Sequence, residues 1–157
     1  MAFSFKAKVK TPKSLRTLRD LWKWEGKTVV FTNGVFDILH AGHVDLLEKA
    51  KRLGDVLIVG LNSDGSARRL GKGPERPVNR WEDRAALLCG LEAVDAVINF
   101  EEDTPAKLVA SLKPDILVKG ADYKRGQIAG AHYAGKVVRI PLKKGYSTTS
   151  LIARLRA

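Results

Sequence analysis

The sequence predicts a single α/β domain: a doubly wound, Rossmann-like parallel sheet of five strands, preceded by an N-terminal helix. Two observations carry this prediction. Short, continuously apolar runs alternate with segments of helical periodicity, which is typical of parallel strands covered on both faces. The chain has 157 residues, of which 45% are hydrophobic, and this is enough for one domain with its own core.

The N-terminal part of the chain is predicted to be a helix followed by a strand. Residues 1–26 are expected to form a basic extension and helix, and residues 27–157 the main domain. Within 12–26, apolar residues at positions 15, 18, 21 and 22 have helical spacing, and Gly26 can end the helix. The run 27–34 is β-branched and closes on glycine, which indicates a buried strand.

Strands and helices alternate along the rest of the chain. Apolar runs predict strands at 55–62, 93–100, 114–120 and 136–142. Helical patterns predict helices at 42–54, 80–91, 104–113 (with Thr104 as N-cap) and 150–157. The polar segment 63–79, rich in Gly and Pro, is predicted to be a loop. Right-handed crossovers then place a ligand crevice at the carboxyl ends of the strands.

The formal net charge of +11 indicates anionic partners, which include nucleic acid, a membrane surface and phosphorylated small molecules. The basic residues are dispersed and form no stripe interleaved with aromatic residues, so most are expected to be solvated surface. No stretch of 18 apolar residues suggests a transmembrane helix, and the N-terminus lacks the apolar core of a secretory signal. The single cysteine, Cys89, fits a reducing cytoplasm and is expected to be buried and inert.

Two histidines stand where the first strand of the main domain gives way to a helix. His40 and His43 are separated by three residues, so they are expected on one side of the helix start. Unpaired backbone N–H groups at such a start suit phosphate, and the positive character of the imidazoles would help as charge builds on phosphorus. The alternative is one capping and one half-buried histidine, and spacing alone leaves both interpretations open. No third ligand stands nearby, so metal binding is not predicted.

The stretch "TNGVFDILHAGHVDLL" resembles the HxGH signature of the nucleotidyltransferase superfamily. "LIVGLNSD", "RPVNRWEDRAALLCGLEAVDAVINFEEDTP", "PDILVKGADY" and "GYSTTSLI" follow in order. Together these segments resemble the adenylyltransferase domain of the bacterial heptose-phosphate enzymes, from about Lys27 to the C-terminus. The resemblance implies transfer of AMP from ATP to D-glycero-β-D-manno-heptose 1-phosphate, giving ADP-heptose for lipopolysaccharide synthesis. It also implies a stand-alone form, with the sugar kinase on another polypeptide.

The resemblance assigns the phosphate contacts to three groups of residues. His40 and His43 are expected to contact the nucleotide phosphates and stabilise the transition state. Lys72, in the Gly-rich loop, is expected to reach the same phosphates, although a loop lysine is often simply solvated. The surrounding phosphate loop comprises Thr32, Asn33, Gly34 and Phe36.

Other positions carry over with an alternative beside each. Asp37 is expected near the acceptor substrate or as a cap of the turn, and Arg84 at the nucleotide or in a surface salt bridge. Gly120 and Asp122 are expected to hold the ribose and base. The hydroxyls and helix N-terminus of the "YSTTS" motif are expected to bind the β- and γ-phosphates, and a capping role is compatible with this. The motif residues concerned are Ser147, Thr148 and Thr149.

The implied reaction is in-line attack by a sugar 1-phosphate oxygen on the α-phosphorus of ATP. An ionised phosphate nucleophile needs positioning and charge neutralisation more than a general base. Mg²⁺ is expected to accompany ATP, and a homodimer is possible. The rivals are a cytidylyltransferase acting on glycerol 3-phosphate or another sugar phosphate, and a nucleic-acid-binding module, which needs neither "HAGH" nor "YSTTS". The loop 131–134 is shorter than the resemblance implies, and His132 there is expected on the surface.

Overall fold

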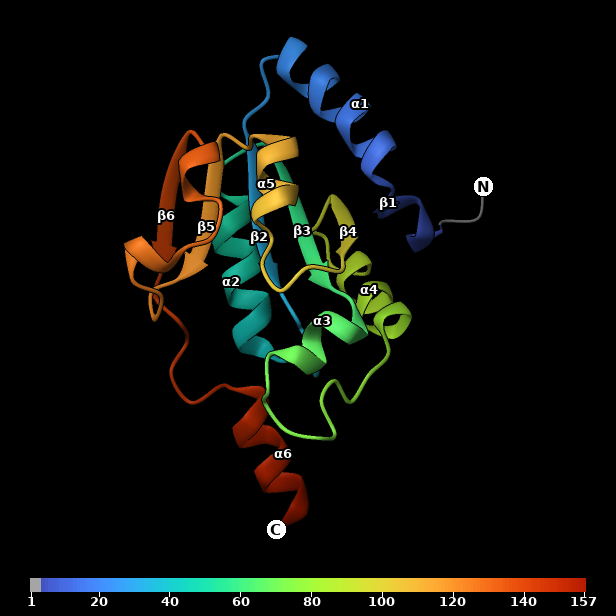
Figure 1. The fold of residues 1–157 in the computed structure, drawn as a ribbon, viewed down its shortest axis with the longest axis vertical. Helices are drawn as coiled ribbons and strands as arrows, with labels where there is room; N and C mark the ends of the chain where they lie inside the picture. The colour runs from blue at the N-terminus through green and yellow to red at the C-terminus, as the bar shows by residue number, and fades with distance from the viewer. Residues whose placement is uncertain (1–3) are drawn as a thin grey trace.

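The computed structural model describes residues 4–157. Within them, six parallel strands form one sheet in the spatial order β1-β4-β3-β2-β5-β6 (Figure 1). The strands are β1 (Val9–Lys10), β2 (Val29–Gly34), β3 (Val56–Asn62), β4 (Ala96–Phe100), β5 (Ile116–Gly120) and β6 (Lys136–Ile140). The predicted α/β class and parallel sheet are confirmed.

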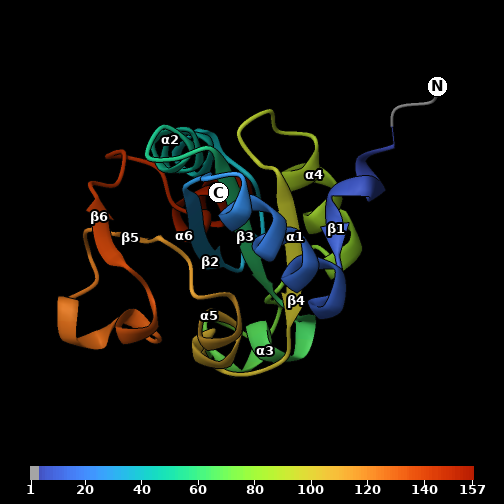
Figure 2. The ribbon, with the colours of Figure 1, turned by 90° about the horizontal axis from the view of Figure 1, so that it is seen from above.

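Helices cover both faces of this sheet (Figure 2). The α-helices are α1 (Pro12–Trp24), α2 (Ala41–Lys51), α3 (Asp64–Arg69), α4 (Trp81–Cys89), α5 (Ala106–Leu112) and α6 (Thr148–Arg156). Short 3-10 helices are η1 (Phe5–Lys8), η2 (Arg125–Gln127) and η3 (Ala131–Tyr133). Among residues 4–157, each helix is too short or too polar to span a bilayer.

The core consists of two apolar layers divided by the sheet. One layer joins β-strand side chains to α2 and α4 through residues such as Leu47 and Leu88. The other joins the opposite strand face to α1 and α5 through residues such as Leu15 and Val109. Every residue of β3 is buried, as expected for a strand with helices on both sides. Cys89 lies in the first layer, and the prediction that its thiol is buried is confirmed.

The prediction of five strands is wrong, because the N-terminal segment adds a sixth. Val9 and Lys10 pair in parallel with Val97 and Ile98 of β4. A strand of two residues, one of them lysine, is too short to show an alternating or apolar pattern. The boundary predicted at residue 26 stays a prediction, and this pairing joins part of the extension to the main sheet.

Two local predictions are also wrong. The segment 63–79 was expected to be a loop throughout, but it begins with helix α3, whose N-cap Ser63 accepts a hydrogen bond from the Ser66 N–H. Thr104 was expected to cap the next helix, yet α5 starts at Ala106 and Pro105 takes the N-cap position without a side-chain cap bond. The proline ring fixes φ near the helical value, so the helix can begin after it with no capping hydroxyl.

The strand order reverses at β2, which pairs with β3 on one side and with β5 on the other. Chains that leave the carboxyl ends of such neighbouring strands diverge toward opposite faces, and a crevice opens between them. Here β2 ends at Gly34, β3 at Asn62 and β5 at Gly120. The fold therefore places the opening at the histidine motif that follows β2.

Candidate active site

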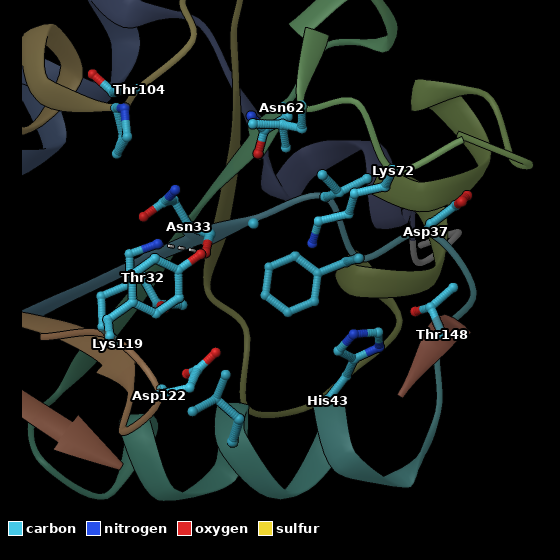
Figure 3. Close-up of a pocket in the computed structure, with 18 of the residues that line it drawn as sticks. Thr32, Asn33, Asp37, His43, Asn62, Lys72, Thr104, Lys119, Asp122 and Thr148 are labelled. Atoms are coloured by element: carbon cyan, nitrogen blue, oxygen red, sulfur yellow. Dashed lines mark hydrogen bonds between the residues drawn. The ribbon is translucent and has the colours of Figure 1, made fainter. Parts of the chain in front are cut away.

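A cavity of about 370 Å³ lies at the carboxyl ends of β2, β3 and β5 (Figure 3). A second cavity of about 260 Å³ adjoins it and shares His43, Lys72 and Thr148 in its lining. The two are compartments of one crevice. Most residues predicted for the site line it: Thr32, Asn33, Gly34, Phe36, Asp37, His43, Lys72, Gly120, Asp122 and Thr148 in the larger compartment, and His40, Ser147 and Thr149 in the smaller.

The two histidines form the N-terminal cap of α2. His40 is the N-cap, and its Nδ1 accepts a hydrogen bond from the Gly42 N–H at 3.1 Å. The His40 N–H in turn donates to Nδ1 of His43 at 3.4 Å. The rings stack with their centroids 3.8 Å apart. Because both Nδ1 atoms accept, each neutral imidazole carries its proton on Nε2, which is left as a donor at the crevice.

The free site favours the neutral form of both imidazoles, because burial lowers the pKa of each. Burial, and then repulsion from His40, lowers the pKa of His43 to about 4. Burial also lowers the pKa of His40 from its ordinary 6.5. The expectation that they contribute positive character in the transition state stays a prediction, and the free site favours their neutral forms. The capping interpretation is confirmed for His40, the N-cap of α2, and contact of either histidine with phosphate stays a prediction.

A second helix N-terminus faces the smaller compartment. Ser147 caps α6 by accepting from the Ser150 N–H at 3.0 Å, which confirms the capping role predicted for it. The approach to α2 is close: a Cβ on Gly42 would lie 2.9 Å from both the Tyr146 Cβ and the His40 Cε1. Glycine at position 42 therefore allows the segment before α6 to pack against the start of α2. Two sets of helix N–H groups then meet at one crevice, an arrangement suited to phosphates.

Lys72 is an exposed residue that reaches both compartments. It belongs to the segment between α3 and α4, and Figure 3 shows its amine directed into the cavity. An ion pair at 3.0 Å between Glu75 and Arg156 connects this segment to α6. The contact lies at the C-terminal end of α6, since Arg156 is the last residue of that helix.

Asp37 holds the end of the Lys72 segment. Its carboxylate accepts from Arg76 Nε at 2.7 Å and from the N–H groups of Val78 and Asn79, each at 2.9 Å. The side chain is almost completely buried. Both oxygens are occupied by protein donors, so the structure shows the turn-holding role, and contact with the acceptor stays a prediction.

Arg84 lies outside the lining of both compartments. It is fully buried and donates to the Val35 carbonyl at 2.7 Å, the Asn79 carbonyl at 3.1 Å and Asp64 Oδ1 at 2.7 Å. The prediction of a surface salt bridge for Arg84 is therefore wrong, because its ion pair with Asp64 has the guanidinium in the protein interior. Arg84 therefore stabilises the loop after β2 from the protein interior, through its hydrogen bond to the Val35 carbonyl.

The walls near β2 and β5 depend on close backbone packing. Thr32 is buried and its hydroxyl donates to the Val118 carbonyl at 3.0 Å, which ties β2 to β5. A Cβ on Gly120 would lie 2.5 Å from Asp122 Oδ1, so glycine lets the chain fold back after β5. Phe36 has φ of 46° and places its ring 5.1 Å from that of His43. Exposed His132 lines neither compartment, as predicted for a surface residue.

Sequence reasoning missed Lys119, a buried lysine that lines the cavity. Its ammonium donates to the Asn33 carbonyl at 3.5 Å and lies 4.7 Å from the centroid of the Tyr123 ring. Burial lowers the pKa of Lys119 to about 8, with Asp122 acting to raise it and Lys72 to lower it. The available signal was a lysine at the end of the apolar run "ILVKG", directly at the switch point. Asn62 and Thr104 also line the cavity and were not predicted there.

Comparison with known sequences gives a consistent set of relatives. Residues 31–154 match the family described as cytidylyltransferase-like. The bifunctional protein HldE of Nitratiruptor sp. is 58% identical over 139 residues, which are 88% of this chain and 30% of HldE. HldE of Syntrophotalea carbinolica is 49% identical over 158 residues, covering 98% of this chain and 32% of that protein. The chain thus spans about a third of the length of these curated relatives.

Two solved structures have similar folds. The lipopolysaccharide core biosynthesis protein from Thermoplasma volcanium is 37% identical, with a TM-score of 0.66 over 76% of this chain and 100% of that one. Pantoate-beta-alanine ligase from Francisella tularensis gives a TM-score of 0.62 over 94% of this chain and 76% of its own. At 17% identity, the second structure shows likeness of fold alone.

Proposed function

The chain belongs to the cytidylyltransferase-like family, and on this premise we propose that it transfers AMP from ATP to a sugar 1-phosphate. The acceptor proposed is D-glycero-β-D-manno-heptose 1-phosphate, and the products are ADP-heptose and pyrophosphate. Similarity to the HldE proteins over most of this chain supports the choice of acceptor. The proposed role is the supply of ADP-heptose for lipopolysaccharide or a related glycan.

One observation carries the proposal: the neutral His40–His43 pair stands at the N-terminus of α2, opposite the N-terminus of α6. Both Nδ1 atoms are occupied, so both Nε2–H groups are available to phosphate oxygens. Neutral donors cost no charge burial in the empty site, and they strengthen as negative charge builds on the ligand. Lys72 adds a positive charge at the boundary of the two compartments.

In the proposed reaction, an oxygen of the sugar 1-phosphate attacks the α-phosphorus of ATP in line with the bond to the β-phosphate. The new P–O bond forms as the α–β bridge breaks, and the electron pair leaves with pyrophosphate. The nucleophile is already ionised, so no side chain has to remove a proton. His43, His40 and Lys72 stabilise the equatorial and leaving oxygens, while Thr148 and its neighbours hold the outer phosphates.

Magnesium is proposed to enter as part of the substrate, as MgATP. Among residues 4–157, no group of three or more His, Cys, Asp or Glu side chains is arranged to hold a metal ion. The carboxylate of Asp37, which lines the cavity, is occupied by three protein donors. The ion is then bound by phosphate oxygens and water, which is a common coordination for this cation.

Product analysis tests the proposal directly. The purified chain is incubated with Mg²⁺ and each of ATP, CTP and GTP, against heptose 1-phosphate, mannose 1-phosphate and glycerol 3-phosphate, and the products are identified by mass spectrometry. ADP-heptose as the product with the highest kcat/KM is expected. A preference for CTP or GTP contradicts the adenylyltransferase assignment while the nucleotidyltransferase class stands.

The second candidate is a cytidylyltransferase acting on glycerol 3-phosphate or another sugar phosphate, and the family description favours it. Gly120 and Asp122, proposed to hold the ribose and base, do not themselves distinguish adenine from cytosine, because neither side chain is an obvious purine reader. Selectivity for the base is therefore assigned to backbone groups and pocket shape near the end of β5. The nine reactions above separate the two candidates. Homodimerisation also remains a proposal, to be checked by sedimentation.

A further inference from the structure

One end of the crevice lies across the cavity from the N-termini of α2 and α6. Figure 3 shows His43, Lys72 and Thr148 on one side of the cavity and Asn33, Lys119 and Thr104 on the other. We propose that this second end binds the polyol of the acceptor, with Asn33 Oδ1 accepting from a sugar hydroxyl and Thr104 as a specificity-determining residue. The inference rests on the proposed function and names the part of the site that selects a phosphorylated polyol.

Asn33 supplies the first line of evidence. It is the penultimate residue of β2 and lines the cavity. Within residues 4–157, its Oδ1 atom is buried and accepts no hydrogen bond. Buried polar atoms in folded proteins are nearly always paired, and an unpaired one needs an explanation. A carbonyl oxygen repels phosphate and suits a hydroxyl donor, so the unpaired atom points to the hydroxyl part of a ligand.

Lys119 shows why the same ligand is also an anion. The residue is 8% exposed, and its ammonium lies between the main-chain carbonyl oxygen of Asn33 and the Tyr123 ring. The negative charge of Asp122 raises the pKa of Lys119, and the positive charge of Lys72 lowers it. An anionic group entering beside Asn33 offsets the cost of burying this charge. A hydroxyl-bearing phosphate satisfies both Asn33 and Lys119.

The wall beyond Asn33 is built from uncharged polar side chains, together with one acidic side chain. Asn62 is buried and donates through Nδ2 to Ser66 Oγ at 2.9 Å, which fixes the orientation of its carboxamide. Asp103 is held by Arg69 at 2.6 Å. Thr104 and Gln127 complete this end of the lining. Amides, a hydroxyl and an oriented carboxylate are the partners that polyol hydroxyls need, and none of them is a strong binder of phosphate.

Two substitutions test the subsite at constant fold. Thr104→Val removes one hydroxyl from an exposed residue without changing side-chain shape, and the matched control Thr17→Val makes the same change on the outer surface of α1. We expect Thr104→Val to raise KM for heptose 1-phosphate by about fivefold, with KM for ATP changed less than about twofold, as for loss of one neutral hydrogen bond. Thr17→Val is expected to leave both KM values unchanged.

Asn33→Ala separates a binding role from a structural one. Since Oδ1 has no protein partner, its removal is expected to leave Tm equal or higher while raising KM for the acceptor by about tenfold. A fall in Tm with unchanged KM identifies Asn33 as structural and overturns the inference. A rise in KM for ATP alone, in either variant, assigns this end to the nucleotide and overturns it as well.

The acceptor panel keeps this inference distinct from the proposed function. Ethyl phosphate has the nucleophile but no hydroxyl, and its kcat/KM is expected to be at least about 100-fold below that of the best polyol phosphate. Preference for mannose 1-phosphate or glycerol 3-phosphate over the heptose overturns only the heptose assignment. Equal use of ethyl phosphate overturns the polyol subsite while the transferase stands, and no turnover of any polyol phosphate overturns both.

Discussion

Helices α2 and α6 direct their N-termini at the same crevice, yet they are attached to the protein in opposite ways. Helix α2 packs on the sheet through Leu47 and Ala50, which are fully buried. Helix α6 has no buried residue, and Figure 1 shows it extending away from the sheet beyond the ends of the strands. One of the two termini proposed to bind phosphate is therefore fixed by the core, and the other is held by its own first turn and by surface contacts.

From this difference in burial we expect the N-terminus of α2 to be stiffer than that of α6. A terminus fixed by packing is preorganised for the reacting phosphorus, where small displacements are costly. A terminus outside the core can move aside to admit a triphosphate and release pyrophosphate. Variants of the two helices should consequently differ in which kinetic constant they change.

The largest effect is expected from breaking the fixed helix at its histidine. His43→Ala removes the Nε2–H donor from the buried end of the crevice and should lower kcat by about 100- to 1,000-fold. Steady-state kinetics on the folded variant provides the measurement. His132→Ala is the matched control, because His132 is exposed and lines neither compartment. Turnover within about threefold of the parent would assign His43 to helix capping alone.

Lys72→Ala tests the side of the site formed by the segment between α3 and α4. We expect kcat/KM for ATP to fall by about 10- to 100-fold, because one positive charge is lost beside the triphosphate. Tm should change by less than about 2 °C, since an exposed loop lysine contributes little packing. Lys107→Ala on α5 is the control, with a side chain 82% exposed and outside the crevice. Unchanged kinetics would make the loop a simple connector.

The pH dependence of stability sharpens the contrast from the fixed side. The pKa of His43 is about 4 in the fold and 6.5 in the unfolded chain, so the unfolded chain binds more protons between these values. The contribution of neutral His43 to the free energy of unfolding is therefore fully present above pH 6.5 and is lost as the pH falls toward 4. Urea unfolding at several pH values should show a smaller decline for His43→Gln than for wild type. Parallel curves would contradict the lowered pKa.

The smallest effect is expected at the link between α6 and the Lys72 loop. The Arg156–Glu75 pair has side chains 65% and 39% exposed, so its contribution is that of a surface ion pair. Arg156→Gln should raise KM for ATP by about twofold, with kcat unchanged, and the effect should disappear at high salt. Arg154→Gln removes the same charge from the same helix and should have no such effect. A fall in kcat would show that α6 is fixed during turnover.

The regular parts of the fold were predictable because their signals are local. Continuous apolar runs identified β2 to β6, and a helix start after glycine-bounded turns located α2 and its histidines. Strand β1 escaped because two residues form no pattern and gain their place only by pairing with β4. Helix α3 escaped because Gly65 and flanking polar residues mimic a loop, while Ser63 supplies the cap.

The side-chain roles were less accessible, because they depend on what the fold brings from a distance. The sequence is compatible with two roles for Asp37. Only the fold shows that donors from residues 76–79 bind its carboxylate. The protonation of His43 depends on burial and on His40 beside it. Lys119 is a single charged residue in an otherwise apolar strand, and only the fold shows that the cavity opens beside it.

The hydrogen bonds around Arg84 determine which positions of the site tolerate substitution. Its guanidinium joins three carbonyl and carboxylate partners from separate segments, at Val35, Asp64 and Asn79, and Asp37 joins two of the same regions. A single substitution there leaves several interior groups unpaired at once, so we expect it to lower the free energy of unfolding strongly. Thr104 lies outside that web. Substitutions at such an exposed position are expected to cost little stability, so the chemistry of that part of the crevice can be changed without loss of the fold.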